Sequence, residues 1–283
     1  MAITLINIAL PTGEVLALWN VSEEYSKKDK HVFLTHGTFS SKKVCLLLAT
    51  YLAENDYNCW ILEWRNHGES FSTQADYNFE TIANEDIKAA LDYLIQDKKI
   101  KKLEVVTHSG GGLCFTIALL TYPAYQQYIH SLTLMACQAT QAAFTWRKRL
   151  RLQISKTMCK MLGYIPAKII GGEYDEPYAF MKQWFDWNLT QQFNGSEQQN
   201  FQKAMASIHI PVLAIFGKGD TFIAPAQGCK EFLGFFQNPE NVLLYAAKET
   251  GFLEDYTHGR IMHSRSAYQD IYPKVLKWME REP

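Results

Sequence analysis

A short strand that ends in a serine and runs at once into three glycines is the feature that most constrains the fold of this chain. Residues 103–107 are predicted to form a buried strand, and Ser109 is followed directly by the glycines. A strand that reverses sharply into a helix brings its backbone close to the first helical turn. The residues two before and two after the turning residue must therefore be small, and Thr107 and Gly111 stand there. The pattern predicts a strained turn that exposes the hydroxyl of Ser109.

The helix expected after this turn, over about residues 111–120, would direct its free N–H groups at the serine oxygen. Together with the positive end of the helix dipole, these groups would stabilise an oxyanion. The pattern therefore suits nucleophilic attack by Ser109. Turns are rich in serine and glycine, however, so an ordinary turn remains an alternative until the rest of the chain is considered.

Predicted strands and helices alternate on both sides of this turn. After an opening hairpin around Pro11-Thr12-Gly13, strands are expected over residues 30–35, 58–63, 103–107, 130–137, 210–216 and 242–245. Helices are expected from Ser40 or Ser41, around residues 82–95, after the turn, and over residues 266–280. This alternation predicts an α/β fold with a mostly parallel central sheet and helices on both of its faces.

Residues 138–208 interrupt the alternation with a long segment in which no strand is expected. The segment is rich in aromatic and methionine side chains. A connection of this length is usually functional or a subdomain of its own. We therefore predict a core formed by residues 1–137 and 209–283 and a helical cap, or lid, formed by residues 138–208. The cap would lie over the strand ends, where open parallel sheets bind ligands.

The composition disfavours some classes of protein but does not identify a reaction. The 283 residues are 47% hydrophobic and carry a net charge of -1, which disfavours a nucleic-acid surface. No apolar run is long enough to span a bilayer, and the first ten residues lack the features of a signal peptide, so a cytoplasmic protein is expected. The six cysteines stand singly and predict buried thiols rather than metal ligands. No metal and no cofactor are expected.

A serine hydroxyl is a weak nucleophile that needs a base, and the base needs an orienting acid. His258 is the preferred base because the loop before the last helix can project it toward Ser109. His67 and His263 remain alternatives.

Asp220 is the preferred acid because it follows directly after the predicted strand over residues 210–216. Its alternative role is that of a turn-capping aspartate. The weaker rivals are Glu249, Glu254 and Asp255.

The chain order Ser109, Asp220, His258 matches that of the α/β-hydrolase fold. The sequence resembles this superfamily over nearly its whole length. His36-Gly37-Thr38 resembles its oxyanion loop, and the stretch Arg65-Asn66-His67-Gly68-Glu69-Ser70 resembles its Arg-x-His-Gly-x-Ser loop. The tail, with Ala267, Ile271-Tyr272 and Trp278 after His258, is similar to acid-lipase and monoacylglycerol-lipase-like members.

The resemblance implies a serine esterase or lipase-like enzyme that forms an acyl-enzyme on Ser109. It further implies that the N–H groups of Thr38 and Gly110 form the oxyanion hole and that Phe39 lines the acyl pocket. The expected substrate is a lipophilic small ester. Thioester hydrolysis, acyl transfer and C–C bond cleavage on the same triad are alternatives, and a non-catalytic ligand receptor is a further one.

The cap is expected to select the substrate. Its aromatic side chains, among them Trp146, Trp184 and Phe185, favour an apolar acyl or aryl group. Trp146, Leu150, Ile154, Met158 and Leu162 recur every four residues among basic side chains. Such a basic amphipathic helix can contact an anionic membrane or receive an acidic substrate, or it can simply be the solvated face of a cap helix.

Overall fold

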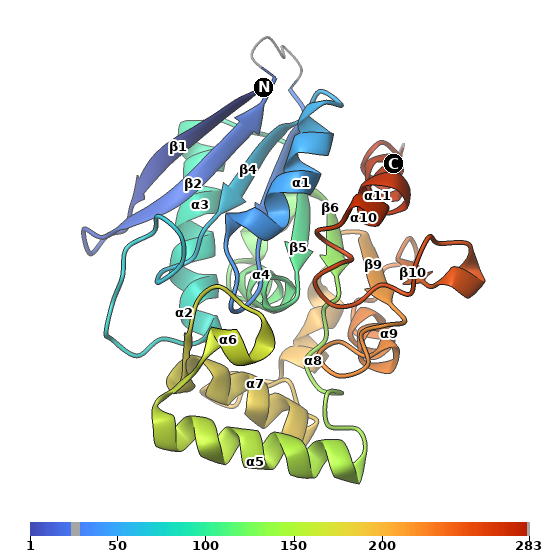
Figure 1. Cartoon of the computed structure of the whole chain (residues 1–283). Helices are drawn as coiled ribbons and strands as arrows, with labels where there is room; N and C mark the ends of the chain where they lie inside the picture. Colours follow the sequence, from blue (N-terminus) through green and yellow to red (C-terminus); the bar gives the residue numbers. More distant parts are fainter. Residues whose placement is uncertain (24–28, 282–283) are drawn as a thin grey trace.

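The computed structural model describes residues 1–23 and 29–281, and an eight-stranded sheet forms its centre (Figure 1). The strands are β1 (Ala2–Ala9), β2 (Val15–Ser22), β3 (His31–Thr35), β4 (Asn58–Leu62), β5 (Leu103–His108), β6 (Ile129–Met135), β9 (Val212–Gly217) and β10 (Val242–Ala246). Their order in the sheet is β1-β2-β4-β3-β5-β6-β9-β10. β2 pairs antiparallel with both of its neighbours, β1 and β4, whereas every pairing from β4 to β10 in this order is parallel. The predicted mostly parallel sheet is confirmed.

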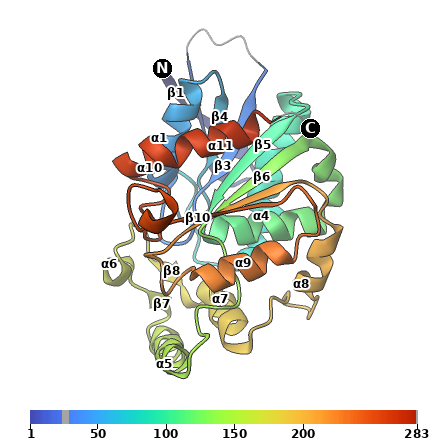
Figure 2. The same cartoon turned by 90° about the vertical axis from the view of Figure 1, so that its right-hand side faces the viewer.

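Helices cover both faces of this sheet (Figure 2). One face carries α1 (Lys42–Ala53), α10 (Arg265–Asp270) and α11 (Tyr272–Met279). The other carries α2 (Phe79–Thr81), η1 (Ile82–Ile87), α3 (Lys88–Asp92), η2 (Tyr93–Asp97), α4 (Gly110–Thr121), η3 (Pro123–Tyr128) and α9 (Ala226–Gly234). Each face buries its own hydrophobic cluster, so the strands between them are apolar on both sides.

The helices differ from the prediction in two places. The helix expected around residues 82–95 contains π-helical turns in η1 and η2. The single closing helix expected over residues 266–280 is wrong, because α10 and α11 are separate helices that meet at Ile271. Pro273 explains the break, since proline has no N–H to donate and fits only in the first turn of a helix. The start of α1 is as predicted, with Ser41 as its cap.

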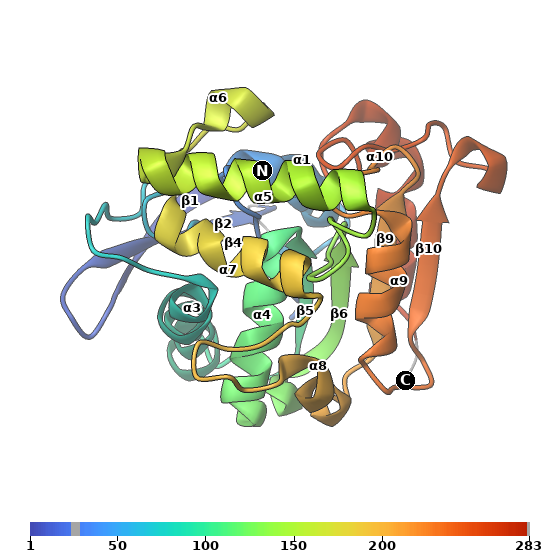
Figure 3. The same cartoon turned by 90° about the horizontal axis from the view of Figure 1, so that it is seen from below.

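The segment after β6 lies below the sheet in Figure 1. It contains α5 (Trp146–Leu162), β7 (Tyr164–Ile165), α6 (Ala167–Ile170), β8 (Glu176–Pro177), α7 (Tyr178–Thr190), α8 (Phe201–Ala204) and η4 (Met205–Ser207). Figure 3 shows α5 and α7 side by side, and the two helices pack on each other. The expectation of no strand here is wrong, since β7 and β8 pair antiparallel. Two-residue strands are too short to show an alternating pattern.

Two further observations bear on the chemistry open to the chain. None of the helices within residues 1–23 and 29–281 combines the length and apolar character needed to cross a membrane. All six cysteines are buried as free thiols, as the sequence predicted.

Candidate active site

Ser109 occupies the turn between β5 and α4 in a conformation that few residues adopt, with φ 52° and ψ −124°. Its N–H donates to the carbonyl oxygen of Met135 at 2.9 Å, and its own carbonyl accepts the N–H of Gly112 at 3.0 Å. The turn is pressed against the end of β3. A Cβ on Gly111 would lie 2.4 Å from the carbonyl oxygen of His36, so only glycine fits there. The predicted strand-to-helix turn is confirmed.

Ser109, His258 and Asp220 form a continuous hydrogen-bonded chain. The Nε2 atom of His258 lies 2.8 Å from Oγ of Ser109, and Nδ1 lies 2.5 Å from Oδ2 of Asp220. An ionised carboxylate only accepts hydrogen bonds, so Nδ1–H must donate to Asp220. Nε2 is then the acceptor for the hydroxyl of Ser109. This is the arrangement in which a histidine can take the proton of a serine nucleophile.

Asp220 is held as an ionised carboxylate in a buried position after β9. Its other oxygen, Oδ1, accepts the N–H groups of Ile223 and Ala224, each at 3.1 Å. Burial alone would raise the pKa of Asp220. The hydrogen bond and charge interaction with His258, together with the two backbone donors, outweigh burial and keep the pKa below its usual value.

His108, the residue before the serine, supports the loop that carries His258. Its Nε2–H donates to the backbone carbonyl of His258 at 2.9 Å, and the two rings lie 4.9 Å apart. Burial and the neighbouring His258 lower the pKa of His108 to about 3, so its ring is neutral. A neutral ring adds no charge that would oppose protonation of His258.

Two backbone N–H groups beside Ser109 have no acceptor within residues 1–23 and 29–281, and they belong to Thr38 and Gly110. Gly110 begins α4, so its N–H has no partner inside the helix. The Thr38 nitrogen is close to Gly110, 3.5 Å from the position that a Cβ on Gly110 would take. These are the two donors that the resemblance to the superfamily implies for the oxyanion hole.

Ser109 opens into a mainly apolar cavity of about 1010 Å³, which is lined by loops at the strand ends and by residues of α5, α6 and α7. Thr38, Gly110, Asp220 and His258 also border it, and its apolar lining includes Phe39, Leu152, Ile165, Met181, Trp184 and Phe185. Phe39, Trp184 and Phe185 are therefore placed where the sequence prediction put them. The sequence does not single out Leu152, Ile165 or Met181, because which side of α5, β7 or α7 faces the cavity depends on how that element packs.

Known structures share this architecture. A family model described as the alpha/beta hydrolase fold matches residues 30–157. An esterase from Exiguobacterium antarcticum aligns over 98% of this chain and 100% of its own, with a TM-score of 0.69 and 16% identity. This chain has the α/β-hydrolase fold.

Two further solved structures support the same fold at low sequence identity. An esterase from Pyrococcus furiosus covers 99% of this chain and 90% of its own, with a TM-score of 0.65 and 19% identity. The mouse alpha/beta hydrolase domain-containing protein 10 covers 98% of each chain, with a TM-score of 0.66 and 13% identity. No curated protein sequence matches the chain. The TM-scores establish the shared fold, whereas identities this low do not establish a shared activity.

The α/β-hydrolase-like loop of residues 65–70 supports the site without contacting Ser109. His67 is committed at both ring nitrogens, because Nδ1 lies 2.8 Å from the Arg65 carbonyl oxygen and Nε2 lies 3.1 Å from Glu176. It is therefore not free to act as the base. His263 borders the cavity, but it is His258 that contacts Ser109.

The rival carboxylates have other partners. Glu249 pairs with Lys218, Glu254 pairs with Arg260, and Asp255 accepts the N–H of Lys248. The structure therefore singles out Asp220 as the carboxylate that meets His258.

The placement predicted for Trp146 is wrong. Its side chain is 70% exposed, the guanidinium of Arg147 lies over its ring, and it does not border the cavity. The stripe of every fourth residue that begins with Trp146 is exposed, although its last two members, Met158 and Leu162, also border the cavity. The side chains that α5 buries are Leu152 and Cys159. The helical period identified a stripe correctly but not which side of α5 meets the protein.

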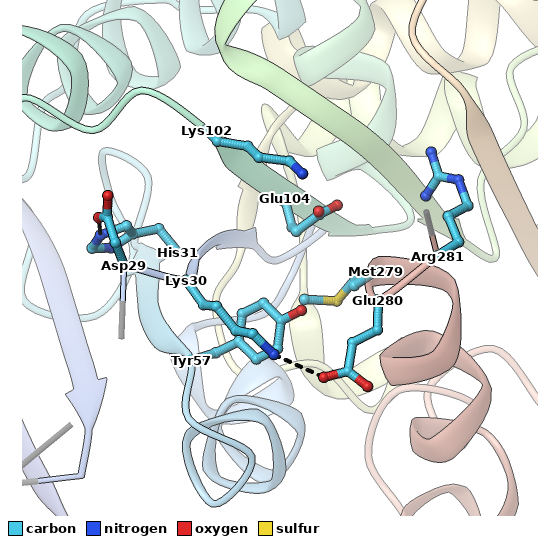
Figure 4. Close-up of a pocket in the computed structure, with 9 residues that line it drawn as sticks. All are labelled: Asp29, Lys30, His31, Tyr57, Lys102, Glu104, Met279, Glu280 and Arg281. Carbon is cyan, nitrogen blue, oxygen red and sulfur yellow. Dashed lines mark hydrogen bonds and ion pairs between the residues drawn. The ribbon is translucent and has the colours of Figure 1, made fainter. Parts of the chain in front are cut away.

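A second cavity, of about 490 Å³, lies at the opposite edge of the sheet (Figure 4). Its lining is mainly charged, and an ion pair of 2.8 Å joins Lys30 to Glu280 across it. Glu104, at the start of β5, contacts Nδ1 of His130 at 2.7 Å and accepts the hydroxyl of Ser131. Burial raises the pKa of Glu104 to about 7, against the opposing effect of Ser131 and nearby cations.

The part of the chain that the structure describes contains no candidate metal site. No group of three or more His, Cys, Asp or Glu side chains there could hold a metal ion.

Proposed function

We propose that this chain is a serine hydrolase that cleaves the carboxylic ester of a lipophilic small molecule through an acyl-enzyme on Ser109. The observation that carries the proposal is the hydrogen-bonded series Ser109–His258–Asp220 at the floor of an apolar cavity. Beside it lie two N–H groups that have no acceptor among the described residues. The esterases among its structural neighbours support the same reaction class.

The reaction follows from the hydrogen bonds. Oγ of Ser109 attacks the ester carbonyl as Nε2 of His258 takes the hydroxyl proton. The carbonyl oxygen becomes an oxyanion that the N–H groups of Thr38 and Gly110 stabilise, and one such donor is typically worth about 10²–10³ in kcat. His258 then protonates the departing alkoxide as the C–O bond breaks. Water, deprotonated by His258, attacks the acyl group and frees Ser109.

The cavity supports an apolar acyl or aryl substrate. A volume of about 1010 Å³ is at the upper end of the usual range for small-molecule sites. Phe39, Trp184 and Phe185 present aromatic surface within it, and burial of a side chain of this size is worth about 1.5–3 kcal/mol. The tail that resembles acid-lipase and monoacylglycerol-lipase-like members also favours a lipophilic ester.

Thioester hydrolysis, acyl transfer and C–C bond cleavage remain alternative reactions, because they would use the same serine, histidine and aspartate. A ligand receptor without catalysis is disfavoured by the complete hydrogen-bonded chain at Ser109.

Turnover of p-nitrophenyl esters of increasing chain length, with an acyl-CoA and a monoacylglycerol alongside, tests the proposal. We expect hydrolysis and fluorophosphonate labelling that Ser109→Ala abolishes. Trp184→Ala should raise KM for long acyl chains about tenfold by removing apolar contact. Trp146→Ala is the matched control, since that tryptophan lies outside the cavity, and it should leave KM unchanged. Labelling that survives Ser109→Ala would contradict the assignment.

We also propose that the outer side of the cap contacts an anionic membrane surface. Large apolar side chains there are exposed, including Trp146 (70%), Met161 (76%) and Ile169 (78%). The helix α5 carries six basic and no acidic side chains, which are Arg147, Lys148, Arg149, Arg151, Lys156 and Lys160. Exposed apolar and cationic side chains together match a lipid interface with negative headgroups.

The cavity opens toward this same surface. Met158, Leu162 and Ile169 border the cavity and are also among the exposed apolar side chains. A lipophilic ester held in a membrane could therefore reach Ser109 without crossing water. The expected cytoplasmic location stays a prediction.

Co-sedimentation with vesicles tests the membrane contact. Replacing Arg147, Arg149 and Lys160 by glutamate should weaken binding to phosphatidylserine-containing vesicles about 100-fold or more, since each basic side chain near the surface is worth about 1 kcal/mol. The control replaces Lys98, Lys99 and Lys101, which are exposed outside the cap and give the same charge change. Equal losses in the two variants, or no binding by the unmodified protein, would overturn the proposal.

A further inference from the structure

A buried carboxylate from the cap contacts the loop that carries Thr38. Glu176, on β8, is fully buried. Its Oε1 accepts the backbone N–H of Phe39 at 2.8 Å and lies 3.1 Å from Nε2 of His67. The hydroxyl of Tyr77 lies 3.4 Å from Oε2. Residues about a hundred or more positions away in the chain therefore contact this one side chain.

Phe39 is held at both of its backbone groups by the same short stretch of the cap. Its N–H donates to Glu176, and its carbonyl accepts the N–H of Glu173 at 2.7 Å. Gly172 packs so closely that a Cβ there would lie 2.6 Å from Cβ of Phe39. Phe39 has φ 62°, a conformation that a residue other than glycine keeps only when its surroundings impose it. The cap supplies these constraints.

Glu176 is fully engaged within the protein rather than free for a substrate. Nδ1–H of His67 donates to the carbonyl of Arg65, and a carboxylate only accepts, so Nε2 also carries a proton. Burial alone would lower the pKa of His67, but the charge of Glu176 and the hydrogen bond to it outweigh burial and raise the pKa. His67 and Glu176 therefore form a buried ion pair, whose carboxylate also holds Phe39.

We propose that Glu176 is a positioning residue that fixes the Thr38–Phe39 loop, so that the oxyanion hole is formed only when this part of the cap is seated. The inference rests on the proposed function. Thr38 offers the unpaired N–H beside Ser109, and Phe39 is the next residue. Freeing the N–H of Phe39 would let its backbone leave the positive-φ region and would move the neighbouring donor away from the oxyanion.

A purely structural link between cap and core is the competing explanation, and Glu80 provides the matched control. Its Oε1 accepts Nε2–H of Gln183 at 2.6 Å and the N–H of Ser196 at 2.7 Å. Glu80 therefore also joins the core to the cap, but it does not contact Thr38 or Phe39.

The first test compares kcat and KM on a short p-nitrophenyl ester. Glu176→Ala should lower kcat about 10- to 100-fold with KM within about threefold, whereas Glu80→Ala should leave both within about threefold. Equal kcat in the two variants, or a change confined to KM, would overturn the inference.

Two conservative variants decide the matter if Glu176→Ala does not fold. Glu176→Gln keeps an oxygen acceptor at the reach of the Phe39 N–H, whereas Glu176→Asp keeps the charge for His67 but is one methylene too short. A positioning role predicts a higher kcat for Glu176→Gln than for Glu176→Asp. The opposite order would show that only the ion pair matters and would overturn the inference.

Amide hydrogen exchange at Phe39 makes the test independent of turnover. Exchange should accelerate at least tenfold in Glu176→Asp relative to Glu176→Gln, whether or not the chain hydrolyses esters. Wild-type protein that neither hydrolyses esters nor reacts with a fluorophosphonate contradicts the proposed function alone. Unchanged exchange at Phe39 contradicts the positioning role alone.

Discussion

The two ends of β5 hold buried polar clusters of different design. Beyond its carboxyl end, Ser109 meets side chains delivered by the loops that follow β9 and β10, and the cluster opens into a large apolar cavity. At its amino end, Glu104 contacts His130 and Ser131 of the adjacent β6, beside a smaller cavity lined mainly by charged groups. Loops that follow parallel strands gather at one edge of the sheet, which is why Ser109, Asp220 and His258 meet there.

Replacing a buried carboxylate by its amide should have different consequences at the two ends of β5. The larger effect is expected at Asp220, where the replacement should lower kcat. Asp220→Asn removes the charge that orients His258 and allows the wrong tautomer of its ring, so kcat should fall about 10³- to 10⁴-fold. Steady-state kinetics on a p-nitrophenyl ester measures the effect, with the melting temperature as a check on folding. A folded Asp220→Asn variant with kcat within tenfold of wild type would contradict the role given to Asp220.

Glu104→Gln should change the free energy of unfolding rather than kcat. This effect is smaller than the one expected for Asp220→Asn. The folded-state pKa of Glu104 is raised from 4.5 to about 7, so the folded form binds the proton more tightly than the unfolded form. Glu104 therefore costs stability increasingly as pH rises from about 4.5 to 7. The gain in unfolding free energy from Glu104→Gln should be about 3 kcal/mol larger at pH 8 than at pH 4.

Urea denaturation at the two pH values measures this gain. Glu280→Gln is the control, because Glu280 borders the same cavity but is exposed and lies in an ion pair with Lys30. A gain from Glu104→Gln that does not vary with pH would show that folding leaves the pKa of Glu104 at its unfolded value. A kcat reduced more than threefold would show that the two ends of β5 are coupled.

The residues at the carboxyl ends of the parallel strands could be predicted from the sequence. Ser109, Asp220 and His258 could be found because each follows a recognisable strand or precedes a recognisable helix, and parallel strands bring such positions together. The strained turn could be found because close approach leaves room only for small residues such as Gly111.

Contacts that depend on how the cap is seated could not be found in this way. Trp146 and Leu152 lie on one helix, yet the first is exposed and the second is buried against the protein. Glu176 belongs to a two-residue strand, and its partners Phe39 and His67 are distant in sequence. Glu104 lies near the start of β5, a strand in which every residue is buried, and the sequence pattern of such a strand does not show which group a charged side chain contacts.

Rapid-quench mass spectrometry with a p-nitrophenyl ester tests the central claim most directly. The intact protein should gain the mass of one acyl group within the first turnover, and peptide mapping should locate it on Ser109. His258→Ala should slow its formation, and Ser109→Ala should abolish it. Ester hydrolysis that proceeds in Ser109→Ala, or an acyl group found on another residue, would contradict the account.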